Sequence, residues 1–247
     1  MSGVVAVAGA GGFLGTVLSA ELAGHFPVRL NDLGSPPAVG EPLPGDLCDA
    51  AVAEKLVEGA SALVINHMLP RTPDAYSHPK RPIDVNVTGT AGLLDAAARH
   101  GCRRIILISS TEVVGGDLKA GQFLSRSRPP SPVSLYGLTK TMQEEAGRYF
   151  HRIHGLEVIA LRPAYVTDED TMRDKYGRHK PSVNWQFIDR RDIASAVVRA
   201  IQLEHVGFEI FHVLGHPDAD QRTDVGETRR SLSWEPLHRF KGYPVDS

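Results

Sequence analysis

The chain has 247 residues, of which 42% are hydrophobic and 23% are charged, and its formal net charge is −2. This balance is typical of one globular domain with a large core, and without a basic stripe the charges give no reason to expect a nucleic-acid partner. The two cysteines, Cys48 and Cys102, are too few for a disulfide framework and lack metal-ligand spacing, so no metal site is expected.

A glycine-rich loop from Gly9 to Gly15 lies between an apolar run at residues 4–8 and a segment with apolar residues at helical spacing. The run predicts a strand buried on both faces, so the glycines stand at a strand-to-helix turn. In that context Gly9 makes a tight turn, Gly12 lets backbone N–H groups approach a pyrophosphate, and Gly15 lets the helix pack closely. The loop therefore predicts a dinucleotide site. Its alternative is a turn without a ligand.

The second predicted strand, residues 28–31, ends at Asp32. A carboxylate at this position accepts hydrogen bonds from the adenine ribose of NAD and repels the extra phosphate of NADP. Arg29 points to the opposite face by strand alternation, so it is not expected to bind that phosphate. Asp32 therefore predicts NAD as the preferred cofactor. Its alternative is a turn residue before Gly34.

A loop rich in proline and glycine is predicted over residues 35–44, before the segment Gly45-Asp46-Leu47. Asp46 is placed either to reach the adenine amino group or to cap the short helix predicted over residues 50–58. A further buried strand is predicted over residues 62–65.

The loop after that strand, residues 66–81, is long and has no periodicity, which is typical of active-site loops. A helix over 84–100 and an apolar strand over 104–109 follow. The alternation of strands and helices predicts an α/β fold with a doubly wound parallel sheet, whose ligands bind beyond the carboxyl ends of the strands. The glycine loop, His67 and Ser110 are all expected on that edge.

Tyr136 and Lys140 are four residues apart at the start of a helix predicted to end near His154, so they share one helical face. A tyrosine with a reference pKa near ~10 is a poor base, and one nearby ammonium supplies about the ~4 kcal/mol needed to bring it to ~7. Tyr136 would then take the proton of a substrate hydroxyl while hydride leaves for NAD⁺, and Ser110 would hold the same oxygen. The alternative is a packed tyrosine beside a surface lysine.

Seven motifs, in this order, resemble those of the extended short-chain dehydrogenase/reductase family, also called NAD-dependent epimerases/dehydratases. They are Gly9-x-x-Gly12-x-x-Gly15, Gly45-Asp46-Leu47, Asn86-Val87-x-Gly89-Thr90, Ser109-Ser110-x-x-Val113-x-Gly115, Tyr136-x-x-x-Lys140, Leu161-Arg162-Pro163 and Asp189-x-x-Asp192. They are specific as a set, although none is specific alone. The resemblance implies a Rossmann-type dinucleotide-binding core over about residues 1–165 and a small C-terminal substrate-binding region over about residues 166–247.

The resemblance also implies which residues act. Ser110, Tyr136 and Lys140 match the catalytic group of the family, in which the lysine also holds the nicotinamide ribose. The implied cofactor-binding residues are Gly9, Gly12, Phe13, Leu14, Gly15, Asp32, Asp46, Leu47, Asn66, His67, Asn86, Ser109, Tyr136, Lys140 and Pro163. In many members the helices matching residues 84–100 and 136–154 form the four-helix bundle of a homodimer, which their apolar faces permit here.

Departures from the family pattern narrow the substrate. Thr111-Glu112 lacks the aspartate acid of nucleotide-sugar dehydratases, and Tyr165 replaces an asparagine with which nucleotide-sugar epimerases hold a diphosphate. The region after Pro163 is also short for a nucleotide sugar. In length and in the stretch from Ser134 to Lys140 the chain is similar to uronate dehydrogenases, which oxidise a free hexuronate, although His67-Met68 replaces small residues of that subgroup.

The candidate substrate contacts lie in the loops expected to cover this edge. They are His67, Thr111, Glu112, Tyr165 and Arg178, with Arg71 and Arg173 as further cations for a substrate carboxylate or phosphate. Each arginine is otherwise a solvated charge. His67 acts as a second acid or base, contacts the substrate, or is a histidine satisfied within its loop.

These observations predict an NAD-dependent oxidoreductase acting on a sugar or sugar-derived hydroxyl or carbonyl. A nucleotide-sugar epimerase with tightly held NAD is one alternative, and a dinucleotide-binding regulator without turnover is the other. No apolar run approaches the ~20 residues of a membrane span, and the first strand begins too early to leave room for a signal peptide. A cytoplasmic protein with no membrane partner is therefore expected.

Overall fold

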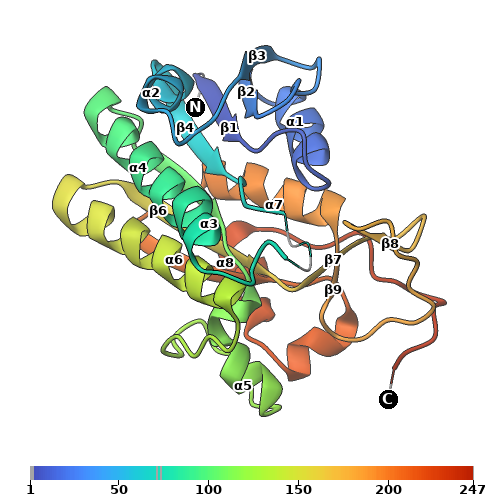
Figure 1. Ribbon diagram of the computed structural model, residues 1–247. Coiled ribbons are helices and arrows are strands. Elements are labelled where there is room, and N and C mark those ends of the chain that lie inside the picture. The colour runs from blue at the N-terminus through green and yellow to red at the C-terminus, as the bar shows by residue number, and fades with distance from the viewer. Residues whose placement is uncertain (1–2, 71, 73, 247) are drawn as a thin grey trace.

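A seven-stranded parallel sheet forms the centre of the molecule (Figure 1). The computed structural model describes residues 3–70, 72 and 74–246, and the strand order is β10-β6-β5-β4-β1-β2-β3. The strands are β1 (Val4–Ala8), β2 (Val28–Asp32), β3 (Glu41–Pro44), β4 (Ala60–Ile65), β5 (Arg104–Ile108), β6 (Glu157–Pro163) and β10 (Phe208–Val213). β1 is the point from which successive strands are added in opposite directions, because it pairs with β2 on one side and with β4 on the other. This is the doubly wound α/β arrangement predicted from the sequence.

Helices cover both faces of the sheet (Figure 1). One face carries α2 (Ala50–Val57), α4 (Gly89–His100) and α6 (Leu135–His154), and the other carries α1 (Gly15–Ala23), α7 (Arg190–Gln202) and α8 (Val225–Leu232). The short helices α3 (Lys80–Pro82) and α5 (Gly115–Lys119) lie in connections. The helix predicted over 84–100 begins as a π-helix at Ile83–Thr88 and becomes α-helical only at Gly89.

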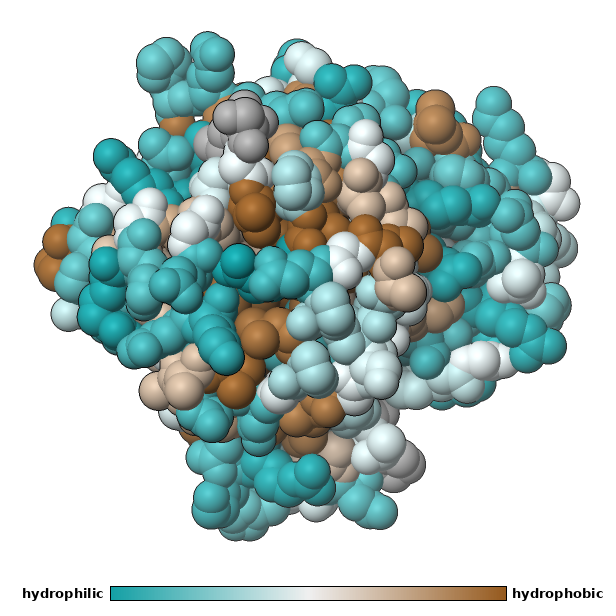
Figure 2. All heavy atoms as spheres, turned by 90° about the horizontal axis from the view of Figure 1, so that it is seen from above, coloured by the Kyte–Doolittle hydropathy of each residue, from teal (hydrophilic) through white to brown (hydrophobic). Residues whose placement is uncertain are grey.

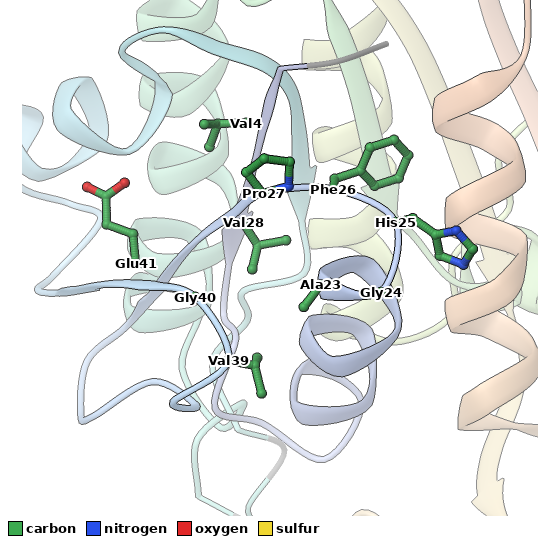
Figure 3. Close-up of a pocket in the computed structure, with 10 residues that line it drawn as sticks. All are labelled: Val4, Ala23, Gly24, His25, Phe26, Pro27, Val28, Val39, Gly40 and Glu41. Atoms are coloured by element: carbon green, nitrogen blue, oxygen red, sulfur yellow. The ribbon is translucent and has the colours of Figure 1, made fainter.

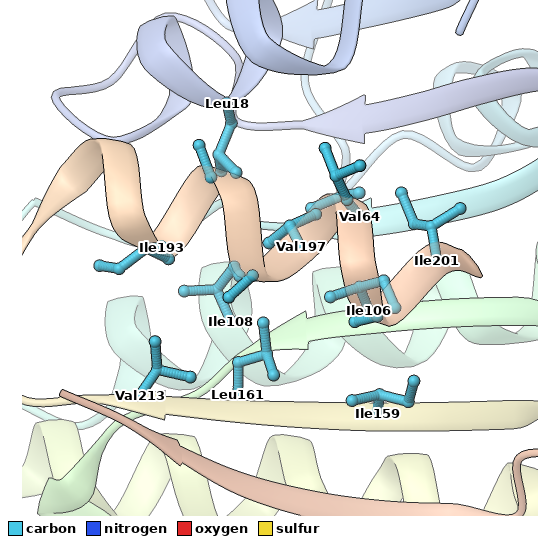
Figure 4. Close-up of a cluster of buried hydrophobic side chains, with 14 of the residues drawn as sticks. Leu18, Val64, Ile106, Ile108, Ile159, Leu161, Ile193, Val197, Ile201 and Val213 are labelled. Carbon is cyan, nitrogen blue, oxygen red and sulfur yellow. The ribbon is translucent and has the colours of Figure 1, made fainter. Parts of the chain in front are cut away.

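Each face of the sheet has its own hydrophobic core. In Figure 4, Val197 and Ile201 of α7 point toward Ile106 of β5, with Leu161 of β6 nearby and Leu18 of α1 above the helix. All five side chains are almost fully buried. Burial on both faces explains why the central strands are nearly continuous apolar runs.

Arginines at the amino ends of two strands hold the C-termini of helices. Arg104 of β5 donates to the carbonyls of Ala200, Ile201 and Leu203 at the end of α7, and it pairs with Glu157. Arg29 of β2 likewise donates to carbonyls at the end of α2 and pairs with Glu41. These contacts satisfy carbonyls that have no partner within their own helix. Arg29 therefore lies away from the glycine loop, on the face predicted for it.

The segment predicted as a loop over 35–44 contains a strand at its end, so that prediction was wrong there. Glu41–Pro44 forms β3, which pairs in parallel with Arg29–Asp32. Two prolines hid the strand in the sequence, because proline is found in sheets only at edges, at strand ends and in bulges. β3 lies at the edge of the sheet.

A second, three-stranded sheet lies beyond the carboxyl end of β6. It consists of β7 (Tyr165–Asp168), β8 (Arg173–Asp174) and β9 (Phe187–Asp189), in the order β8-β7-β9. Arg190 connects it to the glycine loop, because its guanidinium pairs with Asp168, contacts the carbonyl of Phe13 and lies 4.7 Å from the centre of the Phe13 ring. The small sheet therefore contacts the glycine loop at the carboxyl end of the main sheet.

Hydrophilic side chains surround a hydrophobic centre on the face seen from above (Figure 2). In the part of the chain that the structure describes, no helix is long and apolar enough to cross a membrane.

Candidate functional site

The glycine loop joins β1 to α1 with a geometry that side chains would disturb. Gly9 has φ +80°, and a Cβ there would lie 2.7 Å from the backbone of His67. A Cβ on Gly15 would lie 2.1 Å from the carbonyl oxygen of Gly9. By contrast, a Cβ on Gly12 would meet nothing within 4 Å, so this glycine borders open space. The loop thus has a closed side against the sheet and an open side at the start of α1, which fits a bound pyrophosphate.

Polar side chains from neighbouring strands fix this loop. The carboxylate of Asp32, at the end of β2, accepts the N–H of Gly11 at 2.8 Å. Asn66, directly after β4, donates its side-chain N–H to the carbonyl of Gly9 at 2.8 Å. Phe13 and Leu14 occupy the turn before α1, which begins at Gly15. The structure therefore brings Asp32 and Asn66 to the predicted cofactor loop.

Asp46 and Leu47 follow β3 at the same edge. The Asp46 side chain is exposed and accepts the N–H of Cys48 at 2.9 Å, which makes a local turn. Leu47 is buried. Asp49 caps α2 by accepting the N–H of Ala51, so Asp46 is not the cap. One of the two roles predicted for Asp46 is therefore removed.

The three predicted catalytic residues come from two neighbouring elements. Ser110 follows β5 and is buried, with its hydroxyl accepting the N–H of Glu112 at 3.2 Å. Tyr136 and Lys140 lie on the first turns of α6, and both are buried. The Lys140 ammonium donates to the carbonyl of Ile108 at 2.8 Å and lies 5.8 Å from the centre of the Tyr136 ring. Lys140 is therefore held between strand β5 and Tyr136.

Burial lowers the pKa of Lys140. Burial first, and next the charge of Lys175, lower the pKa of Lys140 to about 7, while Glu144 acts in the opposite direction. The ammonium is therefore close to its titration point at neutral pH. A negative group near it, such as a tyrosinate, would favour its charged form.

The start of α6 is fixed by a cap. Ser134 accepts the N–H of Gly137 at 3.0 Å and donates its own hydroxyl to the carboxylate of Glu112 at 2.9 Å. Thr111 is buried next to Ser110. Glu112 and Thr111 were predicted as substrate contacts. In the structure Glu112 orders the helix that carries Tyr136.

Asn86 connects the long loop after β4 to α6. It is fully buried, it accepts the N–H of Leu69, and it donates to the hydroxyls of Tyr76 and Thr139. The ring of Tyr76 meets that of Tyr136 edge-on, with 5.9 Å between the ring centres. Asn86 was predicted as a cofactor contact, but both of its amide hydrogens are used within the protein. Its position indicates a role in placing Tyr136.

His67 follows Asn66 after β4, and its backbone lies against Gly9 of the glycine loop. Its Nε2 atom lies 3.1 Å from the carbonyl oxygen of Val85, and burial, followed by the charge of Lys140, lowers its pKa to about 4. With a pKa this far below 7 the neutral ring is a weak base, so the acid–base interpretation of His67 loses support.

The predicted substrate arginine is engaged elsewhere. Arg178 pairs with Asp174 at 2.8 Å and lies over the ring of Tyr176. Tyr165 stacks on Phe187 with 4.8 Å between ring centres. Arg71 lies outside the described residues, and Arg173 is an exposed residue of β8.

Lys175 was not predicted from the sequence as a site residue, but it lies near Tyr136. Its ammonium is 5.8 Å from the centre of the Tyr136 ring, as far as that of Lys140. Tyr76 was missed as well. Both residues stand in loops that the sequence predicts over the site. Their contact with Tyr136, however, depends on how distant segments of the chain pack together.

Ser109 and Pro163 lie at the ends of adjacent strands. Ser109 is buried and donates its hydroxyl to Glu144, which forms a buried ion pair with Arg162 at 2.7 Å. Pro163 ends β6. This network connects the β5 end that carries Ser110 to the α6 helix that carries Lys140.

One cavity lies far from this group. It has a volume of about 620 Å³ and lies at the amino ends of β1, β2 and β3 (Figure 3). Its lining is mixed and includes Val4, Phe26 and Val28 as well as His25 and Glu41. It lies at the opposite edge from the glycine loop, so it is not the predicted site.

A parallel doubly wound sheet, a glycine loop at the carboxyl end of β1 and a Tyr136–Lys140 pair on the same edge define an extended short-chain dehydrogenase/reductase. The chain belongs to the NAD dependent epimerase/dehydratase family, whose model matches residues 5–183. The family resemblance predicted from the motifs is thereby confirmed.

Several relatives are uronate dehydrogenases. The enzyme of Pseudomonas putida is 34% identical over 62% of this chain and 58% of its own length, and that of Pseudomonas syringae pv. tomato is 31% identical over 83% and 71%. The chain thus spans little more than half of the first enzyme. An NAD-dependent glucose-6-phosphate dehydrogenase of Haloferax volcanii is 24% identical over 98% of both chains.

Solved structures show the same fold. A variant of the uronate dehydrogenase from Agrobacterium tumefaciens in complex with NAD aligns with 98% of this chain and 87% of its own, at a TM-score of 0.79 and 23% identity. Another uronate dehydrogenase variant aligns with 98% and 84%, at a TM-score of 0.79 and 21% identity.

Proposed function

We propose that this protein is an NAD-dependent oxidoreductase that acts on a hydroxyl or carbonyl of a sugar or sugar-derived molecule. The observation that carries this proposal is the position of the Tyr136 ring, whose centre is 5.8 Å from each of two ammonium groups. Its helix packs against the segment after Ser110, on the same sheet edge as the glycine loop. Membership of the family and the sugar dehydrogenases among the relatives support it.

NAD⁺ would supply the acceptor for a hydride when bound, held by the Gly9–Gly15 loop, by Asp32 on the adenine ribose, and by residues after β4 and β6. The open space beside Gly12 and the positive end of α1 fit its pyrophosphate. Asp32 has its carboxylate at the loop, where a negative charge would repel the 2′-phosphate of NADP. We therefore propose residues 1–165 as the cofactor-binding core and residues 166–247 as the substrate-binding portion.

Tyr136 is the proposed acid and base. In oxidation its phenolate takes the proton of the substrate hydroxyl, and in reduction its phenol returns one. The positive charge of Lys140 favours the phenolate, and the Ser110 hydroxyl donates to the substrate oxygen and orients it. The capped start of α6 and the Tyr76 ring keep Tyr136 in place.

The substrate is proposed to be an acidic sugar of the hexuronate class. Lys175 adds a second ammonium near Tyr136, where a substrate carboxylate would lie close to it. Arg178 is unsuited to this task, because its guanidinium is paired with Asp174. The uronate dehydrogenases among the relatives support the same class.

The test follows absorbance at 340 nm with NAD⁺ or NADP⁺ over hexuronates, matched neutral hexoses and nucleotide sugars, with Tyr136→Phe alongside. We expect NADH formation with hexuronates, weaker turnover of the neutral hexoses, and a loss of about 10²- to 10⁴-fold in kcat for Tyr136→Phe. Interconversion of two nucleotide sugars without net NADH would instead support an epimerase. Binding of NAD with no turnover at all would support a regulator.

We also propose a homodimer built on α4 and α6. The side chains of Leu138, Tyr149 and Ile153 on α6 are 41%, 48% and 55% exposed, which leaves apolar surface for a second copy. Light scattering is expected to give about twice the 26.8 kDa of one chain, and a value near one chain mass would contradict the dimer.

The proposed location is the cytoplasm. Cys48 and Cys102 form no disulfide, which fits a reducing compartment.

A further inference from the structure

The imidazole of His67 is fixed in one orientation. Its Nε2 atom faces the carbonyl oxygen of Val85 at 3.1 Å, and because a carbonyl only accepts, Nε2 carries the hydrogen. The ring has little room on that side, since a Cβ on Gly89 would lie 3.0 Å from Nε2. In a neutral ring held this way, Nδ1 is a bare acceptor.

Nδ1 of His67 is buried and has no hydrogen-bond partner among the described residues. Three other buried side-chain atoms in that part of the chain share this condition, but His67 is the residue whose backbone closes against Gly9 of the glycine loop. A buried acceptor without a donor is unfavourable, so a ligand that brings a hydrogen to Nδ1 gains affinity.

The position of the ring narrows the ligand group. The backbone of His67 lies against Gly9 of the glycine loop, and its ring is near enough to Lys140 for the charge of that lysine to act on it. A phosphate carries no hydrogen to donate at neutral pH, whereas a ribose hydroxyl both donates and accepts. The charged form of Lys140 can only donate. A ribose beside Lys140 therefore needs an acceptor for its hydroxyl hydrogens.

We propose that Nδ1 of His67 accepts a hydrogen bond from a hydroxyl of the nicotinamide ribose, as a positioning contact for that half of the cofactor. The proposal rests on the proposed NAD dependence of the protein. A leucine or alanine at this position has no side-chain acceptor and could not make this contact.

The test compares two substitutions of nearly equal polarity. His67→Gln keeps a side-chain N–H within reach of Val85 but has no acceptor at the Nδ1 position, whereas His67→Asn keeps an acceptor there. Calorimetry with ADP-ribose and with ADP separates the two halves of the cofactor, since ADP lacks the second ribose. We expect His67→Gln to weaken ADP-ribose about tenfold and ADP by less than twofold, with His67→Asn closer to the unsubstituted protein.

A second measurement observes the His67 ring directly in the unsubstituted protein. In protein labelled with ¹⁵N-histidine, the Nδ1 resonance of His67 is expected to move upfield with ADP-ribose but not with ADP, because accepting a hydrogen bond shields a bare nitrogen. His67→Gln assigns the resonance, and His78→Gln is a surface control whose affinities should not change.

Each result decides between the claims. Unchanged ADP-ribose affinity in His67→Gln, with an unmoved Nδ1 resonance, would overturn the ribose contact while leaving NAD dependence intact. Equal weakening of ADP and ADP-ribose would also overturn it, because the contact would then be to the shared half. Failure of the unsubstituted protein to bind NAD or ADP-ribose would refute the proposed function itself.

Discussion

The burial of Lys140, which the proposed mechanism uses, lowers the stability of the folded protein. Its ammonium is almost fully buried and has one carbonyl partner, Ile108, in place of the water it would have in the unfolded chain. The lowered pKa, about 7, records this loss of hydration. The residue that is proposed to favour the phenolate of Tyr136 is therefore one that destabilises the empty enzyme.

Lys140→Met tests this cost through pH. Because the folded pKa of about 7 lies below the ordinary lysine value of 10.5, the unfolded chain binds more protons between these values, and wild-type stability rises with pH. We expect Lys140→Met to be the more stable protein at pH 7, with the difference shrinking by up to about 1.4 kcal/mol per pH unit toward pH 10. Urea unfolding at several pH values measures this. A difference that stays constant with pH would contradict the buried, titrating lysine.

Asp32 is the residue proposed to set a preference for NAD over NADP. Asp32→Asn keeps an oxygen that can accept the N–H of Gly11 but removes the negative charge. We expect the ratio of kcat/KM for NAD⁺ over NADP⁺ to fall about tenfold, which corresponds to about 1.4 kcal/mol of lost repulsion. An unchanged ratio would mean that other groups reject the 2′-phosphate. Asp46→Asn, at the same edge but exposed, is a matched control.

Two arginines join strands to helices, and they differ in exposure. The side chain of Arg104 is 4% exposed and serves three carbonyls at the end of α7, whereas that of Arg29 is 16% exposed and serves the end of α2. A buried carbonyl that loses its donor is destabilised more than one that water reaches.

Arg104→Met is therefore expected to lower the free energy of unfolding by about 3 kcal/mol, and Arg29→Met by about 1 kcal/mol. Chemical denaturation with circular dichroism measures both. Equal losses would show that burial does not set the difference, and full retention of stability in Arg104→Met would contradict the capping role.

The sheet and the catalytic edge were predictable because their signals are local. Strands β1, β4 and β5 are apolar runs buried on both faces, and the glycine loop, Asp32, Tyr136 and Lys140 stand next to element ends that the sequence marks. The parallel topology then brings those ends together.

Features that depend on pairing between distant segments were not predictable. The β8-β7-β9 sheet consists of strands of two to four residues, which no periodicity reveals. Lys175, which directly follows β8, lies near the ring of Tyr136 although the two residues are far apart in the sequence. The partner of His67, a backbone carbonyl of the π-helix, also has no signature in the sequence.

The prolines of β3 have a consequence for association between molecules. Gly45, just after β3, donates its N–H inward to the carbonyl of Asp32, so by strand alternation the N–H groups of residues 41 and 43 also point inward. Pro42 and Pro44 then occupy the outward positions, where an ordinary strand would offer donors to a neighbour. That edge of the sheet cannot template another strand, which protects a long parallel sheet against growth by aggregation.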